Sequence, residues 1–315
     1  MVDSDAISRI DVPCALCGCG EAEVRYRIGE FRVQQCVQCG LVAVNPRFPE
    51  EETSHVYEAY YGGEARVQDT DGEKCYGGYI KDVERQRSRR VHLNRIHRRR
   101  LRTLENLAPG RRLLDVGSAA GFFLMDARER RWEVSGLDVS DSAARYARSH
   151  RLAVRTGTLK DTHLEPESVD AVTMWEVVEH LHDPLRDLLT LRHALRPHGA
   201  LAISTPNYDS VLRRIRGGRW HGFKLDEHLS LFSPQTVGLL LEEAGFEPVR
   251  LLTVRTDLLR ARRALLRIRG RVPDALYETL RLGQTAINES LGKVIFFPWE
   301  KLLQGDVLEV YARKR

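Results

Sequence analysis

The chain has 315 residues, of which 42% are hydrophobic, so it can bury the core of one large or two modest domains. No apolar run approaches the ~20 residues that span a bilayer. The polar, acidic start has no secretory signal, so we expect a cytoplasmic protein without a transmembrane segment. The net charge of +5 is modest for a nucleic-acid enzyme.

Two Cys-x-x-Cys pairs near the start have the spacing of a four-thiolate zinc site. They are Cys14, Cys17, Cys36 and Cys39. Gly18 and Gly40 follow the two pairs, where tight turns need positive φ, and the residues between the pairs alternate enough for a hairpin. We expect a structural Zn²⁺ site, because four sulfur ligands leave no open position for chemistry. Disulfides or free thiols are the alternative, and Cys19 is an extra thiol that could be mistaken for a ligand.

Residues 1–48 are therefore predicted to form a zinc-ribbon module, and residues 49–110 a segment that leads to the first strand of a second domain. This segment is rich in tyrosine before a basic helix expected over residues 81–107. Residues 81–102 carry ten Lys and Arg against two acids. Such a run is usually the solvated face of a helix, but it could also bind nucleic acid, an anionic substrate or a membrane surface.

The sequence RLLDVGSAAG at residues 112–121 predicts a buried strand followed by a glycine loop and a helix. Such a loop leaves N–H groups at the helix start that suit an anion, although an ordinary turn without a ligand is the alternative. The next strand ends in Asp138, where an acid takes the ribose hydroxyls of a nucleoside ligand. The spacing of Gly117 and Gly121 is not the G-x-G-x-x-G of dinucleotide-binding folds.

Strands and helices continue to alternate along the chain, which is typical of a doubly wound α/β domain. We expect strands over residues 112–116, 132–138, 152–157, 168–175, 199–205 and 246–254. We expect helices over residues 121–130, 141–149 and 183–195, and from Ser233 to Gly245. Residues 256–304 are predicted to be a helical insertion. Its basic, amphipathic start at 256–272 could lie on a membrane surface, bind a partner or cap a substrate pocket.

Five motifs resemble, in order and spacing, those of the class I S-adenosylmethionine (SAM)-dependent methyltransferases. They are LLDVGSAAG, VSGLDVS, RTGTLKD, DAVTMWEVVEHLHDP and LRPHGALAISTPN. The resemblance covers roughly Leu101 to Val254. It implies a Rossmann-like α/β fold with a seven-stranded sheet, in which VLEVYARK is the antiparallel last strand of a methyltransferase domain at 111–315. Ala119 and His198 stand where the family usually has glycine.

The resemblance also implies which residues bind SAM. The loop amides and the helix start suit its carboxylate, Asp138 its ribose, and Thr158 and Leu159 its adenine, while Trp175 and Glu176 end the fourth strand. The full set is Asp115, Gly117, Ser118, Gly121, Asp138, Val139, Thr158, Leu159, Trp175 and Glu176. In relatives the segment before the first strand forms a lid, so one of its tyrosines is expected to touch SAM or substrate, or else to pack on the sheet. These are Tyr57, Tyr60, Tyr61, Tyr76 and Tyr79.

Glu176, Glu179 and His180 stand at i, i+3 and i+4, which would point them the same way on one helical turn, and His228 follows later. ExxEH resembles the ubiquinone-pathway O-methyltransferases and, with the later histidine, the small-RNA 2′-O-methyltransferases. The resemblance implies that all four residues hold Mg²⁺ or a similar ion, with Glu179, His180 and His228 as catalytic candidates. Alternatively, Glu179 and His180 only orient the loop, and His228 acts alone as a base or fills space.

Three functions are compatible with these patterns. The first is methyl transfer to oxygen or carbon of a small molecule such as a quinone precursor, sugar or natural product. An arginine-rich loop with Trp220 and Phe223 suggests an anionic acceptor, unless that loop is merely solvated. The second is metal-assisted RNA 2′-O-methylation. The third is a zinc-ribbon interaction protein with a degenerate methyltransferase domain, against which the intact Asp115, Gly117 and Asp138 argue.

Overall fold

The computed structural model describes residues 9–55, 57, 93–254 and 303–315. Nearly all of the expected insertion at 256–304, including the stretch 256–272, lies outside these residues. So do residues 81–92 of the basic segment and every tyrosine of the expected lid except Tyr57. Within the part of the chain that is described, no helix is both long and apolar enough to cross a membrane.

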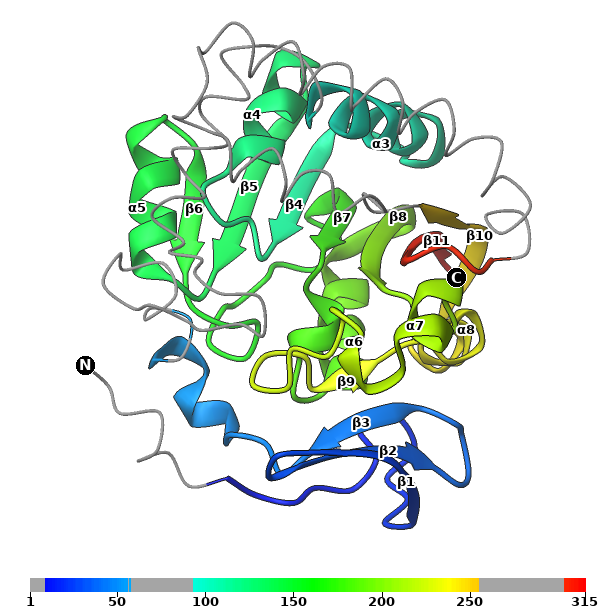
Figure 1. Ribbon diagram of the computed structural model, residues 1–315. Coiled ribbons are helices and arrows are strands. Elements are labelled where there is room, and N and C mark those ends of the chain that lie inside the picture. The colour runs from blue at the N-terminus through cyan, green and yellow to red at the C-terminus, as the bar shows by residue number, and fades with distance from the viewer. Residues whose placement is uncertain (1–8, 56, 58–92, 255–302) are drawn as a thin grey trace, which may run out of the picture.

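A seven-stranded sheet forms the centre of the molecule, in the order β10-β11-β8-β7-β4-β5-β6 (Figure 1). The strands are β4 (Arg112–Val116), β5 (Glu133–Asp138), β6 (Ala153–Thr156), β7 (Val169–Trp175), β8 (Leu195–Pro206), β10 (Phe246–Val254) and β11 (Val307–Lys314). Strands β4 to β8 run parallel, whereas β11 is antiparallel to both of its neighbours. The predicted fold class is thus confirmed.

Strand β8 begins at Leu195 rather than at the predicted residue 199. Leu195 pairs with Val169 ahead of a register shift, and His198 adopts a φ of +60° there. A residue in the left-handed region is typical of a bulge that lets a strand continue past an irregularity. This explains why the family usually has glycine where this chain has His198.

Helices cover both faces of the sheet (Figure 1). Helices α3 (Leu93–Leu107), α4 (Phe122–Glu129) and α5 (Asp141–Ser149) lie on one face, and α6 (Pro184–Ala194) and α8 (Pro234–Glu243) on the other. Asp183 and Ser233 cap α6 and α8 as predicted, since their side chains accept hydrogen bonds from Arg186 and Thr236 N–H. The short elements are η2 (Glu50–Glu52), η3 (Val178–His180), α7 (Val211–Arg216) and η4 (Gly217–Arg219).

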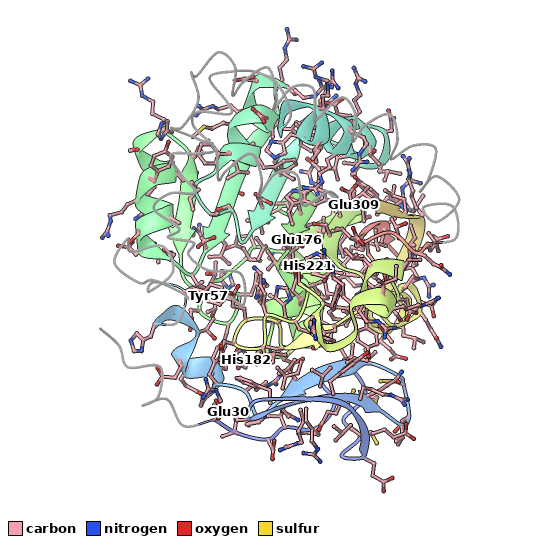
Figure 2. All side chains as sticks on the ribbon, viewed as in Figure 1. Glu30, Tyr57, Glu176, His182, His221 and Glu309 are labelled. Carbon is pink, nitrogen blue, oxygen red and sulfur yellow. The ribbon has the colours of Figure 1, made fainter. Side chains whose placement is uncertain are left out.

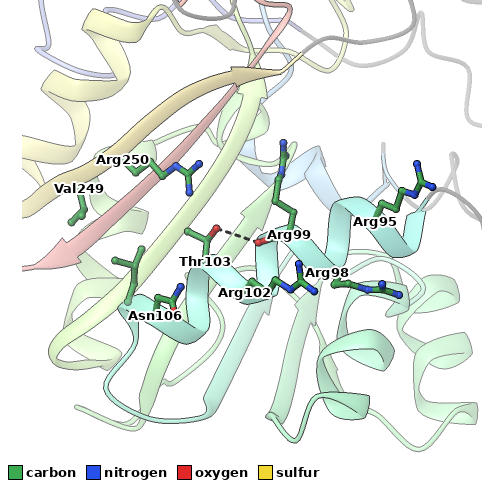
Figure 3. Close-up of a pocket in the computed structure, with 9 residues that line it drawn as sticks. Arg95, Arg98, Arg99, Arg102, Thr103, Asn106, Val249 and Arg250 are labelled. Atoms are coloured by element: carbon green, nitrogen blue, oxygen red, sulfur yellow. Dashed lines mark hydrogen bonds between the residues drawn. The ribbon is translucent and has the colours of Figure 1, made fainter. Parts of the chain in front are cut away.

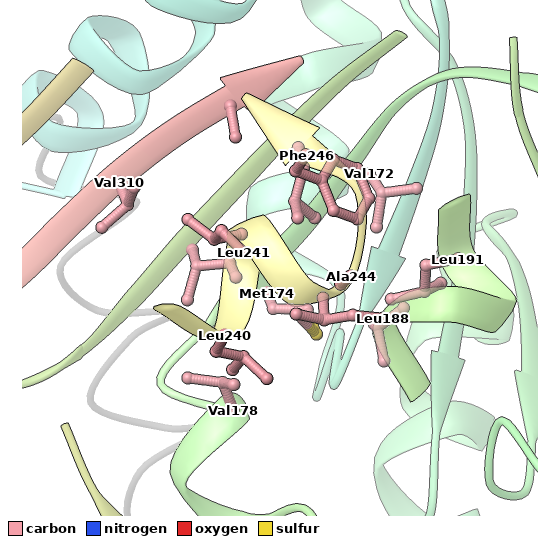
Figure 4. Packing of buried hydrophobic residues seen from close by; sticks show 14 of the residues in the cluster. Val172, Met174, Val178, Leu188, Leu191, Leu240, Leu241, Ala244, Phe246 and Val310 are labelled. Atoms are coloured by element: carbon pink, nitrogen blue, oxygen red, sulfur yellow. The ribbon is translucent and has the colours of Figure 1, made fainter. Parts of the chain in front are cut away.

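Alternate residues of each strand feed two hydrophobic cores, as the period of two along a strand requires. Val172 and Met174 face α6 and α8 (Figure 4), whereas Ala171, just before Val172, faces α3 to α5. Leu16 and Leu41, from the N-terminal module, are buried in the first of these cores. The N-terminal module therefore packs directly on the methyltransferase sheet.

The N-terminal module is a small four-stranded sheet, in the order β1-β2-β3-β9. Its strands are β1 (Ala22–Ile28), β2 (Phe31–Cys36), β3 (Val42–Asn45) and β9 (Ser230–Leu231). The β1–β2 hairpin between the cysteine pairs confirms the prediction. The sequence did not predict β3 or β9, and β9 comes from the methyltransferase domain. Packing and pairing therefore cross the predicted boundary at residue 48.

Candidate functional site

The loop between β4 and α4 needs glycine at two positions. Gly117 and Gly121 have φ values of +68° and +75°, which side chains rarely adopt. A Cβ at Gly117 would lie 2.4 Å from Cγ2 of Val177, and one at Gly121 would lie 2.4 Å from Cδ1 of Leu152. Ala119 also lies in the left-handed region, with φ of +47°, so the alanine accepts the backbone conformation that glycine would adopt there.

Most amides of this loop hold the loop to β5. The Gly117 and Ser118 N–H groups donate to the Leu137 carbonyl at 2.8 and 3.1 Å, and the Ala119 N–H donates to Asp138 Oδ2 at 2.7 Å. These amides are therefore engaged within the protein. The Gly121 N–H is also engaged, since it donates to the Ser118 carbonyl at 2.9 Å, but no side chain caps the start of α4. The first turn of α4 is thus the part of the loop that suits a ligand carboxylate.

Asp115 lies within β4 and Asp138 ends β5, and the two carboxylates have different surroundings. Asp138 is buried, and its Oδ1 accepts a hydrogen bond from Ser140 N–H at 2.9 Å. Each carboxylate oxygen has two lone pairs, so these bonds orient Asp138 without excluding a further donor. Asp115 is also buried and accepts a hydrogen bond from the Thr173 hydroxyl at 2.6 Å. Burial raises the pKa of Asp115 to about 7, and the geometry makes it a link between β4 and β7.

The other residues expected around the cofactor follow the carboxyl ends of β5, β6 and β7. Val139 and Thr158 are half-buried, and the Thr158 hydroxyl donates to Asp161 at 2.6 Å. Leu159 belongs to the hydrophobic core. The Trp175 ring has the Arg100 guanidinium 3.9 Å from its centroid.

Glu179, His180 and His228 come together at the carboxyl edge of the sheet, with one potential ligand atom from each within 4.8 Å of the others. Glu179 is fully buried, and neither carboxylate oxygen has a hydrogen bond of good geometry in the described residues. Nδ1 of His180 and Nδ1 of His228 each lie 2.8 Å from a backbone carbonyl, of Glu227 and Gly222 respectively. The two Nε2 atoms thus remain as potential ligands, in the arrangement usual for metal-binding histidines.

Burial sets the protonation of these three side chains in the absence of an ion. It raises the pKa of Glu179 well above its usual range, and the charge of Glu176 adds to the rise. Burial lowers the pKa of His180 to about 4, and lowers that of His228 together with the charges of His180 and Lys224. Burial thus favours the neutral form of all three side chains, and a cation would favour the ionised form of Glu179.

Glu176, the fourth predicted ligand, is not among the described side chains whose ligand atoms lie within 4.8 Å of one another. Its Oε1 accepts a hydrogen bond from the Ser204 hydroxyl at 2.8 Å, and its φ is +57°. A regular helical turn would bring positions i, i+3 and i+4 to one face, but only η3 (Val178–His180) is helical here. Glu176 therefore precedes the turn instead of sharing a face with Glu179.

The four predicted cysteines form a second cluster, with all sulfur atoms within 4.8 Å of one another. Cys14 and Cys39 have their sulfurs 3.4 Å apart, and Cys17 and Cys36 have theirs 3.5 Å apart. These are non-bonded distances between thiols gathered around one centre, as in a tetrahedral sulfur site. Cys19 lies outside the cluster, with its sulfur 3.7 Å from the Glu21 carbonyl.

Of the lid tyrosines, Tyr57 reaches the histidine cluster, where its hydroxyl is 2.6 Å from His180 Nδ1 (Figure 2). The arginine-rich loop differs from the expectation. Trp220 is buried in a cluster with Val42 and Leu231 of the small sheet. Arg213 lies over the Tyr208 ring, 4.3 Å from its centroid. Trp220 is thus a core residue and not an acceptor contact.

The glycine loop, the acid that ends β5 and the seven-stranded sheet define a class I SAM-dependent methyltransferase. The chain belongs to the family described as Methyltransferase domain, whose model matches residues 84–251, more than half of the chain. Membership of this family supports an enzyme that uses SAM.

Curated relatives carry related descriptions. The chain is 32% identical over 127 residues to a ubiquinone biosynthesis O-methyltransferase from Idiomarina loihiensis, covering 36% of this chain and 51% of the relative. It is 31% identical over 150 residues to a probable SAM-dependent methyltransferase from Mycolicibacterium smegmatis, covering 46% and 55%. The chain thus spans about half the length of the curated relatives it matches. A SAM-dependent methyltransferase structure from Thermotoga maritima aligns with a TM-score of 0.48 and 18% identity, covering 76% of this chain and 98% of that one.

Proposed function

We propose that the protein transfers the methyl group of SAM to an oxygen of a small-molecule acceptor, at a site where Glu179, His180 and His228 hold a divalent ion. The buried Glu179 carboxylate carries this proposal. A buried carboxyl that lacks hydrogen bonds is costly unless a cation or another partner satisfies it. Two imidazoles with Nε2 to spare complete a donor set that suits a divalent metal such as Mg²⁺ or Mn²⁺.

The residues expected to bind SAM surround the same edge of the sheet. We place the amino-acid carboxylate at the first turn of α4, the ribose at Asp138 and the adenine near Thr158 and Leu159. The methyl group then moves in line from sulfur to the acceptor oxygen, so the main task of the protein is alignment. The acceptor hydroxyl must lose its proton. A bound divalent ion would lower the pKa of that hydroxyl, so that its proton can pass to solvent. Without the ion, Nε2 of His180 or His228 has its lone pair free to accept the proton.

The description of the relatives as ubiquinone biosynthesis O-methyltransferases supports a hydroxylated aromatic acceptor, such as a quinone precursor. We also propose that the four cysteines bind Zn²⁺ in a closed, structural site, since four thiolates leave no position for a substrate.

The test measures SAM binding by calorimetry and transfer of labelled methyl groups to a panel of hydroxylated aromatic acceptors. Protein dialysed against metal-free buffer, with its zinc content checked, is compared with the same protein supplied with Mg²⁺ or Mn²⁺. Transfer that requires the added ion is the expected result. Transfer that is independent of the ion would remove the metal role, and absence of SAM binding would remove the whole proposal.

A second candidate, RNA 2′-O-methylation, is favoured by a basic groove between α3 and β10 (Figure 3). The groove has a volume of about 620 Å³, and no acidic side chain lines it. Its lining residues are Arg95, Arg98, Arg99, Arg102, Thr103, Asn106, Leu107, Val249 and Arg250. Arg98, Arg102 and Arg250 have no ion pair within the described parts of the chain. Several unpaired arginines along one groove suit a chain of phosphates.

An RNA substrate predicts binding that weakens steeply with salt and with Arg98→Ala or Arg102→Ala. Transfer to small aromatic acceptors should not change in these two variants. Salt-independent or undetectable RNA binding would leave the small-molecule reaction as the function.

A further inference from the structure

The N-terminal sheet ends on a strand that belongs to the methyltransferase domain. Val42 and Ala43 of β3 pair antiparallel with Leu231 and Ser230 of β9. The pairing extends to the preceding residue, because Val44 N–H donates to the Leu229 carbonyl at 3.1 Å. Strand β9 thus begins two positions after His228, a member of the histidine cluster, and is held by β3.

Leu229 connects this pairing to the other side of the cluster. Its own N–H donates to the carbonyl of Glu179 at 2.8 Å. Leu229 is also the residue that follows His228 in the chain, and it is fully buried. A single backbone unit therefore links the N-terminal sheet to the main chain of both Glu179 and His228.

A second connection runs from the end of β3 to the loop that follows His180. The Arg47 guanidinium donates to the His182 carbonyl at 3.1 Å. The His182 ring in turn has its Nε2 2.9 Å from the Phe48 carbonyl. Arg47 and Phe48 are both buried, so these bonds are shielded from competing water.

The cysteine cluster leads directly into β3. Cys36 N–H donates to the Leu41 carbonyl at 2.9 Å, which closes the second knuckle, and Val42 begins the strand. Leu41 is buried in the same hydrophobic core as Phe232, the core that contains α6 and α8. Phe232 follows β9 in the chain. The position of β3 is therefore fixed at one end by the four cysteines and along its edge by β9.

We propose that the N-terminal module is a positioning element of the acceptor site, in which the cysteine-bound ion fixes β3 and β3 holds Leu229, and with it Glu179 and His228. A two-residue strand such as β9 is too short to keep an extended conformation without its partner. This positioning role rests on the proposed function in one respect, namely that Glu179 and His228 take part in methyl transfer. The mechanical connection is independent of those roles.

Hydrogen exchange of the full-length, zinc-loaded protein tests this connection without an activity assay. Cys36→Ser, which removes a sulfur from the cluster, is compared with Cys19→Ser, which removes a thiol outside it. We expect exchange of residues 227–231 to rise about tenfold or more in Cys36→Ser only. Exchange of the loop at 117–121 should change less than about twofold, because this loop does not pair with β3. The dissociation constant for SAM should also change less than about twofold.

Leu231→Ala provides the second variant, since it loosens β9 while all four cysteines stay in place. Its zinc content should match that of the parent protein. We expect the same selective exchange at 227–231, and a fall of about tenfold in kcat with KM for SAM unchanged. Unchanged exchange at 227–231 in both variants overturns the proposal, as does equal loss of protection at 117–121. A parent protein with no methyl transfer would contradict the proposed function, while the exchange results would still decide the positioning role.

Discussion

Ala119 and Asp138 are joined by a hydrogen bond of 2.7 Å, from the backbone N–H of the loop residue to the carboxylate that ends β5. The bond holds the loop after β4 against the end of the neighbouring strand. It also orients a buried carboxylate toward the crevice where ligands of such sheets bind. Two residues nineteen positions apart thereby form one structural unit, and each can be tested separately.

Asp138→Ala should weaken SAM binding by at least ~1 kcal/mol, or about fivefold in dissociation constant, because hydrogen bonds from the ribose are lost. Calorimetry with the purified protein measures this directly. Asp141→Ala is the matched control, since Asp141 is an acid nearby that pairs with Arg145 and Arg148 instead of with the loop. Equal affinity in the parent and in Asp138→Ala would contradict the ribose assignment.

Ala119→Gly should destabilise the protein less than Ala120→Gly. Ala119 has φ of +47°, where an L-residue is strained and glycine is not. Ala120 is fully buried and has no such φ, so Ala120→Gly loses a packed methyl group without relief of strain. Chemical denaturation should find Ala119→Gly more stable than Ala120→Gly by at least ~1 kcal/mol. The reverse order would show that the loop is not strained at Ala119.

The sequence predicts the sheet well because its strands are apolar runs that glycine, proline and capping residues delimit. The bounds of α5, β10 and β11 agree with the predictions, and the caps at Asp183 and Ser233 are confirmed. Strand β9 could not be predicted in the same way. Two residues carry no periodicity, and β9 is a strand only because β3 pairs with it.

The site was predicted in part for a similar reason. Local spacing places the members of each Cys-x-x-Cys pair together, and Glu179 beside His180. The fold then brings the two cysteine pairs into one cluster and adds His228 to the other. Glu176 lies apart, since the backbone at φ of +57° turns before η3, and no pattern in the sequence marks that turn. Trp220 is buried through a contact between segments distant in sequence, which charge patterning in its own loop cannot reveal.

Asp115→Asn should change how stability depends on pH. The pKa of Asp115 is raised by burial from 3.8 to about 7 in the folded protein. A raised pKa means that its contribution to stability is complete below about pH 3.8 and is lost as pH rises toward 7. Relative to the parent, the asparagine variant should thus gain stability across this window, by at most ~4 kcal/mol.

Denaturant unfolding at several pH values between 4 and 8 measures this gain. Thr173→Val should act in the opposite direction, because the Thr173 hydroxyl donates to Asp115 and stabilises the charged form. A constant difference between the parent and Asp115→Asn across the window would show that Asp115 does not titrate there.

Glu179→Gln and Glu176→Gln distinguish the three-residue cluster from the four-residue set that the motif implies. Among the described residues, Glu179 has no hydrogen bond of good geometry and lies beside His180 and His228, whereas Glu176 is bonded to Ser204. A ligand role for Glu179 predicts loss of divalent-ion binding and a fall in kcat of ~100-fold or more in Glu179→Gln, because the acceptor hydroxyl then keeps its proton. SAM affinity should be preserved. Calorimetric titration with Mn²⁺ and steady-state kinetics measure these effects.

Glu176→Gln should retain ion binding, since its amide can still accept the hydrogen bond from Ser204. Equal loss of the ion in both variants would place Glu176 back among the ligands, which requires the backbone after β7 to rearrange when the ion binds. Full ion binding in Glu179→Gln would instead show that Glu179 is not a ligand of the ion. Each variant removes one negative charge from the same motif, but only Glu179 belongs to the cluster. A difference between the two variants therefore reports the position of the carboxylate and not the loss of charge.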